Sequence, residues 1–201
     1  MGCSHAKIFS SLKPSSEKVI SITFDDGPSL KTTPHVLAVL KKYKILATFF
    51  VLGERAKRFP HLLKKIVQEG HTLANHSYDH RCFTKLSKDQ QDQDIKKTTQ
   101  ILSAYQHDIT YFRPPYGAKN KNTQDIAQKN HLDIVLWSID PEDWRRPSKK
   151  KLIASVLSNL HPGGILLLHD IHQGTAAALE ELIVCIQKKG YRFVPLTYHP
   201  S

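Results

Sequence analysis

The sequence predicts an α/β fold built on a parallel β-sheet. Two observations favour it: strand-like and helix-like segments alternate along the chain, and the strand-like segments are short and almost wholly apolar. A strand that is apolar on both faces is buried between two layers, which is typical of a parallel sheet covered by helices. Such a sheet is either open or closed into a barrel, and in both arrangements ligands bind at the C-terminal ends of the strands.

β-branched and aromatic residues, bounded by turn residues, mark the strands. In chain order we expect strands at residues 19–24, 47–52, 71–75, 110–112, 132–139, 165–168 and 192–195. Val19, Ile20, Ile22 and Phe24 illustrate the pattern, and the pair Gly27-Pro28 ends that first strand.

Apolar residues at helical spacing predict six helices between these strands. In chain order they cover residues 34–43, 60–70, 87–105, 122–129, 148–160 and 175–190. Pro34 and Pro60 suit the first turn of a helix, whereas Asn122 and Ser148 are capping residues. Gly190 ends the last helix.

Length and composition are those of an ordinary globular protein. The chain has 201 residues, 40% of them hydrophobic and 23% charged, which is enough for one domain with a full core. Residues 1–17 are polar and mixed and predict a flexible N-terminal tail, so a single domain is expected over 18–201. No apolar segment suits a secretory signal or approaches the roughly 20 residues needed to span a membrane.

The net charge of +11 favours anionic partners. The lysines are nevertheless spread in short runs over expected helix surfaces, and no nucleic-acid-binding module is recognisable, so nucleic-acid binding is not expected. The three cysteines are far apart and form no disulfide framework. The sequence favours a monomer or a weak oligomer.

Polar residues that carry chemistry follow one strand after another. They are Asp25 and Asp26, then Asn75, His76 and His80, then Arg113 and Tyr116, then Asp140, Asp143 and Trp144, and finally His169 and Asp170. In a parallel α/β fold all of these positions meet at one rim. This convergence predicts a single active site.

Two of these groups favour a metal ion. Adjacent carboxylates such as Asp25 and Asp26 repel unless a proton or a cation neutralises one of them, although an ordinary solvated turn also has this composition. His76 and His80 are four residues apart, and on a helical turn they would share a face. With one carboxylate they would form a two-histidine, one-carboxylate site with open positions.

The five polar groups resemble the ordered motifs of the polysaccharide deacetylases, the NodB-homology group of carbohydrate esterases (family 4). They are TFDDG at residues 23–27, HSxxH at 76–80, RPPYG at 113–117, DxxDW at 140–144 and LLHD at 167–170. The resemblance covers residues 18–196. It implies an incomplete, distorted (β/α)7 barrel and one divalent metal ion, usually Zn²⁺, with Co²⁺ or another divalent ion as an alternative.

The resemblance also implies a role for each motif residue. Asp25 would be the general base, Arg113 its orienting partner, and His169 the general acid held by Asp143. The metal ligands would be Asp26, His76 and His80. Substrate would contact Pro115, Tyr116, whose backbone N–H would stabilise the oxyanion, and Trp144 and Leu167 in the acetyl pocket. Trp137 is interpreted as structural, and Asp170 as a residue that holds local backbone.

The implied reaction is removal of N-acetyl groups from N-acetylglucosamine units in peptidoglycan or chitin-like oligomers. An O-acetyl esterase acting on a polysaccharide such as xylan would use the same residues, and an inactive carbohydrate-binding relative is a further alternative. The family resemblance implies a cell-envelope or extracytoplasmic location, with the cytoplasm as the alternative.

Overall fold

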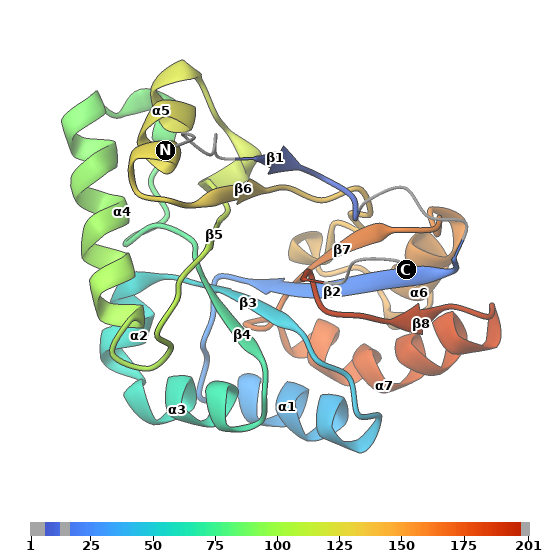
Figure 1. Ribbon diagram of the computed structural model, residues 1–201. Helices are drawn as coiled ribbons and strands as arrows, with labels where there is room; N and C mark the ends of the chain where they lie inside the picture. Colours follow the sequence, from blue (N-terminus) through green and yellow to red (C-terminus); the bar gives the residue numbers. More distant parts are fainter. Residues whose placement is uncertain (1–6, 13–16, 198–201) are drawn as a thin grey trace.

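The computed structural model describes residues 7–12 and 17–197 and contains one curved sheet surrounded by helices (Figure 1). The strands are β1 (Ile8–Phe9), β2 (Val19–Asp25), β3 (Thr48–Val51), β4 (Thr72–Asn75), β5 (Tyr111–Phe112), β6 (Asp133–Val135), β7 (Gly164–His169) and β8 (Arg192–Phe193). The helices are α1 (Thr33–Lys42), α2 (Gly53–Arg58), α3 (Pro60–Gln68), α4 (Lys88–Leu102), α5 (Lys121–Lys129), α6 (Lys149–Ser158) and α7 (Gln173–Lys188). Short 3₁₀ turns cover Phe83–Lys85, Pro115–Gly117 and Asp143–Arg145.

The sheet is parallel and curls towards closure. Its strand order is β1-β6-β5-β4-β3-β2-β7, and β8 pairs with the start of β2. Isolated bridges join Ser11 to Gly164 and Ile139 to Leu166, so the segments beside β1 and β6 meet β7 at the other end of the order. The predicted incomplete barrel is therefore confirmed.

Strand β2 shows how this barrel is filled. Its side chains alternate: Ile20, Ile22 and Phe24 belong to the large core beneath the helices, whereas Val19 packs in a smaller apolar cluster. Thr23 and Asp25, on the same face as Val19, are buried polar groups. The interior thus becomes polar towards the C-terminal end of β2, where the active site is expected.

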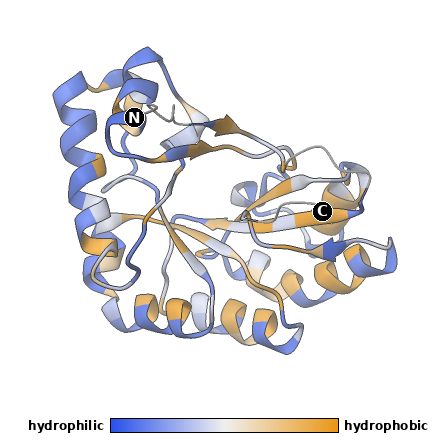
Figure 2. Ribbon diagram, viewed as in Figure 1, coloured by the Kyte–Doolittle hydropathy of each residue, from blue (hydrophilic) through white to orange (hydrophobic). Residues whose placement is uncertain are grey.

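Helices cover the outside of the sheet, and their apolar faces turn inward (Figure 2). α1 and α7 lie along one side, while α4 stands beside β4 (Figure 1). Ser87 begins α4 with a capping box, because its hydroxyl accepts from the Gln90 N–H and the Gln90 side chain accepts from the Ser87 N–H. This capping box fixes the start of α4, the helix to which Asn75 and the Tyr78 N–H of the following loop are hydrogen-bonded.

Four local expectations are corrected. Residues 7–12 are not part of a flexible tail: β1 pairs with β6, and Leu12 is buried. The remaining part of that prediction falls largely outside the described residues. Helix α5 is capped by Asn120 rather than Asn122, since the Asn120 side chain accepts from the Thr123 N–H. The strand expected at residues 132–139 is limited to β6, and α2 was not anticipated.

Candidate active site

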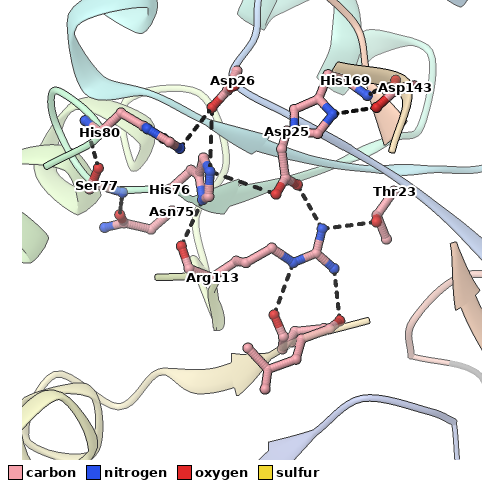
Figure 3. A network of polar contacts seen from close by, with 12 residues as sticks. Thr23, Asp25, Asp26, Asn75, His76, Ser77, His80, Arg113, Asp143 and His169 are labelled. Carbon is pink, nitrogen blue, oxygen red and sulfur yellow. Dashed lines mark hydrogen bonds and ion pairs between the residues drawn. The ribbon is translucent and has the colours of Figure 1, made fainter. Parts of the chain in front are cut away.

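Asp25 and Asp26 reach the same cleft because the chain turns sharply at Asp26, directly after the end of β2. Asp25 is the last residue of β2, and Asp26 has a left-handed backbone with φ 69°. Both carboxylates point towards the histidines of the neighbouring loop (Figure 3). Aspartate tolerates this conformation better than most residues. Because Asp26 adopts it, the two side chains do not point to opposite faces as neighbours within a strand would.

Asp25 is tied to Arg113 inside the barrel. The Arg113 Nη1 donates to Asp25 Oδ1 at 2.6 Å and to Thr23 Oγ1 at 3.0 Å (Figure 3). Its Nε and Nη2 donate to the carbonyls of Val135 and Leu136. Arg113 is fully buried, so the alternative of a surface arginine before a Pro-Pro turn is excluded.

Asp26, His76 and His80 bring three potential ligand atoms together. Asp26 Oδ1 lies 3.4 Å from His76 Nε2 and 3.3 Å from His80 Nε2. It is buried and makes no hydrogen bond within the described ranges. Ligand atoms about 2.0–2.1 Å from a tetrahedral zinc ion are about 3.3–3.4 Å apart, so these residues fit a divalent cation.

His76 and His80 were predicted to share one helical turn, but the structure places them on a loop. Residues 76–80 form a loop in which Ser77 has φ 71° and His80 has φ 61°. Asn75 stabilises this loop: its Oδ1 accepts from the Ser77 N–H, and its Nδ2 donates to the Ile95 carbonyl on α4. The loop brings the two imidazole centroids within 5.1 Å of each other.

His76 is oriented by its second ring nitrogen. Its Nδ1 lies 2.7 Å from the carbonyl oxygen of Arg113. A carbonyl only accepts, so Nδ1 donates, and Nε2 is the ring atom that remains to offer a lone pair. The same residue, Arg113, therefore orients Asp25 with its side chain and His76 with its backbone.

The electrostatics favour a charged Asp26. Burial raises the pKa of its carboxyl, but the close polar contact and charge of His76, with the charges of His80 and His169, outweigh burial and hold the pKa well below its ordinary value. An ionised carboxylate beside two imidazoles is a suitable ligand set for a divalent cation.

His169 and Asp143 form a second polar pair across the site (Figure 3). The His169 Nδ1 and Asp143 Oδ1 are 2.6 Å apart, and Asp143 Oδ2 accepts from the His169 backbone N–H and from Thr175 Oγ1. Burial lowers the pKa of His169, but the hydrogen bond and charge of Asp143 raise it to about 9. His169 is therefore protonated at neutral pH.

A pocket of about 230 Å³ joins these groups. It is lined by Asp25, His76, His80, Tyr116, Trp137, Asp140, Trp144, Leu167 and His169. Exposed aromatic rings stand at its wall, with 67% of Tyr116 and 48% of Trp144 accessible, while Leu167 is buried. The structure thus brings most of the predicted site residues to one small cavity.

Two predictions about this pocket need correction. Pro115 is buried at the start of the 3₁₀ turn and does not line the pocket, so a substrate contact by Pro115 is not supported. Trp137 was interpreted as structural, yet it lines the pocket, and its ring limits the space at Gly117. Its position just beyond β6, at the same end of the sheet, is the sequence signal that indicates such a role.

Asp170 packs against Gly27 beside the site, and its hydrogen bond goes to a side chain rather than to the local backbone that was expected. Its Oδ2 accepts from Thr33 Oγ1, and a Cβ at Gly27 would lie 2.1 Å from its Oδ1. Burial raises the pKa of Asp170 to about 7. Glycine at position 27 is required by this close approach, which sets the path of the chain after Asp26.

Left-handed backbone is concentrated around the pocket. Among the non-glycine residues described, those with positive φ on the site loops are Asp26, Ser77, His80, Tyr116, Glu142 and Arg146. Such conformations are uncommon, and they persist where surrounding contacts determine them, which is frequent at functional sites.

The described helices include none with the length and apolarity needed to cross a bilayer.

Known proteins similar to this chain share one family. A polysaccharide deacetylase family model matches residues 12–135. A peptidoglycan-N-acetylglucosamine deacetylase from Bacillus cereus is 38% identical over 91% of this chain and 68% of its own length. The peptidoglycan-N-acetylmuramic acid deacetylase PdaC from Bacillus subtilis is 39% identical over 90% of this chain, which spans only 38% of that protein. A chitooligosaccharide deacetylase from Azorhizobium caulinodans is 34% identical, with 88% of this chain and 92% of that protein covered.

Solved structures of similar shape include an enzyme and a pseudoenzyme. The peptidoglycan N-acetylglucosamine deacetylase Bc1960 superposes with a TM-score of 0.90 at 38% identity, covering 96% of this chain and 91% of that one. BA3943 from Bacillus anthracis, a pseudoenzyme of carbohydrate esterase family 4, superposes with a TM-score of 0.89 at 29% identity, covering 94% and 67%. The fold alone therefore does not show activity, which depends on the residues of the site.

Proposed function

Because this chain belongs to the polysaccharide deacetylase family, we propose that it is a metal-dependent hydrolase that removes N-acetyl groups from N-acetylglucosamine-containing glycans. One observation carries the proposal: three potential metal ligands lie between an arginine-bound aspartate and an aspartate-bound histidine, around a single pocket. The names of the relatives support peptidoglycan or chitin-like oligomers as substrate.

The residues that would hold the metal are Asp26 through Oδ1, and His76 and His80 through Nε2. Two nitrogens and one oxygen in an open set suit zinc, which we propose as the ion. When bound, such an ion supplies Lewis-acid polarisation of the amide carbonyl and lowers the pKa of a coordinated water.

Asp25 is proposed as the general base. Its Oδ2 lies 3.6 Å from His76 Nε2, so the carboxylate faces the same space as the ligand atoms. Arg113 holds the other oxygen, which fixes the carboxylate in position to take a proton from the attacking water. The oxygen of that water then forms a bond to the acetyl carbon.

His169 is proposed as the general acid. Asp143 holds its Nδ1, which leaves Nε2 to face the pocket and to protonate the amine nitrogen as the carbon–nitrogen bond breaks. The products are acetate and a free amino sugar. We assign the Tyr116 backbone N–H to oxyanion stabilisation, and Trp144, Leu167 and Trp137 to the walls around the acetyl group.

Mass spectrometry of a substrate panel tests this proposal. Chitooligosaccharides, peptidoglycan fragments and acetylxylan should be incubated with the metal-loaded protein and with the Asp25→Asn variant. We expect acetyl loss from the N-acetylated glycans only, and none with the variant. Acetyl loss confined to acetylxylan would instead identify an O-acetyl esterase, and the absence of any loss would identify an inactive relative.

Since peptidoglycan lies outside the cytoplasmic membrane, we propose that the reaction takes place in the cell envelope.

A further inference from the structure

A second and larger cavity adjoins the proposed acid. Its volume is about 470 Å³, and it lies between the loop after β2, the loop before α6 and the start of α7. The residues that matter for its chemistry are Lys31, Thr32, Asp143, Arg146 and His172. Asp143 lies between the two cavities: it lines this one, and its carboxylate contacts His169, which lines the catalytic pocket.

Two exposed basic side chains border the cavity. Lys31 and Arg146 line it, and within the described ranges neither side chain forms an ion pair with an acidic residue. The only carboxylate in the lining, Asp143, is already engaged by His169 and Thr175. Burial lowers the pKa of His172, so at neutral pH this imidazole provides hydrogen bonding rather than charge.

Two helices begin at this cavity, and the N-terminus that offers N–H groups to it is that of α7, because in α1 the Thr33 N–H donates to the Ser29 carbonyl and Pro34 has no N–H. Thr32 precedes α1, His172 precedes α7, and neither side chain makes a capping hydrogen bond. Helix N-termini attract anions, because their first N–H groups lack partners within the helix. In addition, the Thr32 hydroxyl is buried and has no hydrogen-bond partner in the part of the chain that the structure describes.

We propose that this cavity binds a carboxylate carried by the glycan, next to the sugar that loses its acetyl group. This inference rests on the proposed function and narrows it to acidic glycans. Of the sugars named for the relatives, N-acetylmuramic acid bears such a group, a lactyl carboxylate, whereas the units of chitin are neutral. The +11 net charge of the chain acts in the same direction.

The test compares three substrates: an oligosaccharide that alternates N-acetylglucosamine and N-acetylmuramic acid, the same oligosaccharide with its carboxylates methyl-esterified, and chitotetraose. The variants are Lys31→Gln and Arg146→Asn; asparagine suits position 146 because the backbone there is left-handed, with φ 54°. Lys64→Gln, an exposed position on α3, is the control for the loss of one positive charge.

For the acidic oligosaccharide we expect each variant to lower kcat/KM about tenfold, as the loss of a charge-assisted hydrogen bond does. The methyl ester and chitotetraose should change less than about twofold, and Lys64→Gln should not discriminate among the substrates. A loss of the same size on all three substrates, or on none, overturns the carboxylate site.

A binding measurement separates this inference from the proposed function. Calorimetric titration of the acidic oligosaccharide and its methyl ester into the Asp25→Asn protein should show tighter binding of the acid. Arg146→Asn in that background should remove the difference. If wild-type protein deacetylates nothing but this preference is present, the proposed function fails and the carboxylate site stands. Equal affinity for acid and ester overturns the site.

Discussion

Arg113 Nη1 donates a hydrogen bond to Asp25 Oδ1 at 2.6 Å, across 88 positions of sequence and inside a barrel where Arg113 is fully buried. The guanidinium also stacks over Phe50, with 3.9 Å from its carbon to the ring centroid. Thr23 Oγ1 and the backbone carbonyls of Val135 and Leu136 accept hydrogen bonds from three more of its N–H groups. The proposed catalytic end of β2 and the core of the barrel thus depend on the same residue.

Replacing Arg113 should therefore impair both stability and turnover. In Arg113→Gln the Asp25 carboxylate would be left buried without its cation, and breaking a buried ion pair in this way typically costs about 3–5 kcal/mol. Denaturant unfolding measures this loss, and turnover of the folded fraction should fall as well. Arg113→Lys keeps the charge and should recover part of the stability. Wild-type unfolding of Arg113→Gln would contradict the assigned role.

The alkaline limit of activity should follow the Asp143–His169 pair. Because Asp143 raises the pKa of His169 to about 9, the acid is protonated at neutral pH, and kcat/KM should fall as pH rises through about 9. In Asp143→Asn this limb should move towards the ordinary histidine value of about 6.5. A pH–rate profile of both proteins measures the shift, and an unchanged alkaline limb would remove His169 from the acid role.

The same pair affects stability in a defined direction. The folded pKa of His169 lies above its unfolded value, so the pair stabilises the protein fully below about pH 6.5 and loses that contribution as pH rises through about 9. Unfolding curves of wild type and His169→Gln at pH 6 and pH 9.5 should differ more at the lower pH. A difference that grows with pH would contradict this account.

Gly27 should tolerate no side chain. A Cβ there would lie 2.1 Å from Asp170 Oδ1, and Asp170 is fully buried and bonded to Thr33, so it cannot move away freely. We expect Gly27→Ala to lose about 1–3 kcal/mol through overpacking and to displace Asp26. Gly174→Ala is the control, because no atom lies within 4 Å of its Cβ position. Equal melting temperatures for the two variants would refute the argument.

Much of this architecture could be predicted because the signals are local. Apolar strands alternating with amphipathic helices indicate a parallel sheet, and the rule that ligands meet at strand ends places Asp25, His76, Arg113, Asp143 and His169 together. The structure confirms the incomplete barrel and brings these five residues around one site. The direction of the parallel strands alone determines that these residues lie at one end of the sheet.

The remaining features depend on contacts between distant segments. Ile8 and Phe9 form a strand by pairing with the edge of β6. Two apolar residues within the mostly polar segment 1–17 give no local sign of this pairing. The HxxxH spacing suggested a helical turn, whereas contacts from Asn75 and α4 impose a loop. Arg113 has a charged side chain and would be expected at the surface. It is fully buried because acceptors from β2 and the β6 region surround its guanidinium.

The central claim is that the neighbouring residues Asp25 and Asp26 have different chemical tasks. Asp26 belongs to the candidate three-ligand cluster, while Asp25 is held by Arg113 and is proposed to take a proton from the attacking water. A null hypothesis treats two adjacent aspartates as equivalent. The geometry predicts that each substitution will produce its own combination of metal content and activity.

The most direct measurement is metal content by elemental analysis beside turnover, on Asp25→Asn and Asp26→Ala purified in parallel. Asp26→Ala should lose the metal and the activity together. Asp25→Asn should retain the metal and lose about 10²–10⁴-fold in turnover, the usual effect of removing a general base. Retention of metal by Asp26→Ala together with its loss from Asp25→Asn would reverse the two assignments, and wild-type turnover in both variants would place the active site elsewhere.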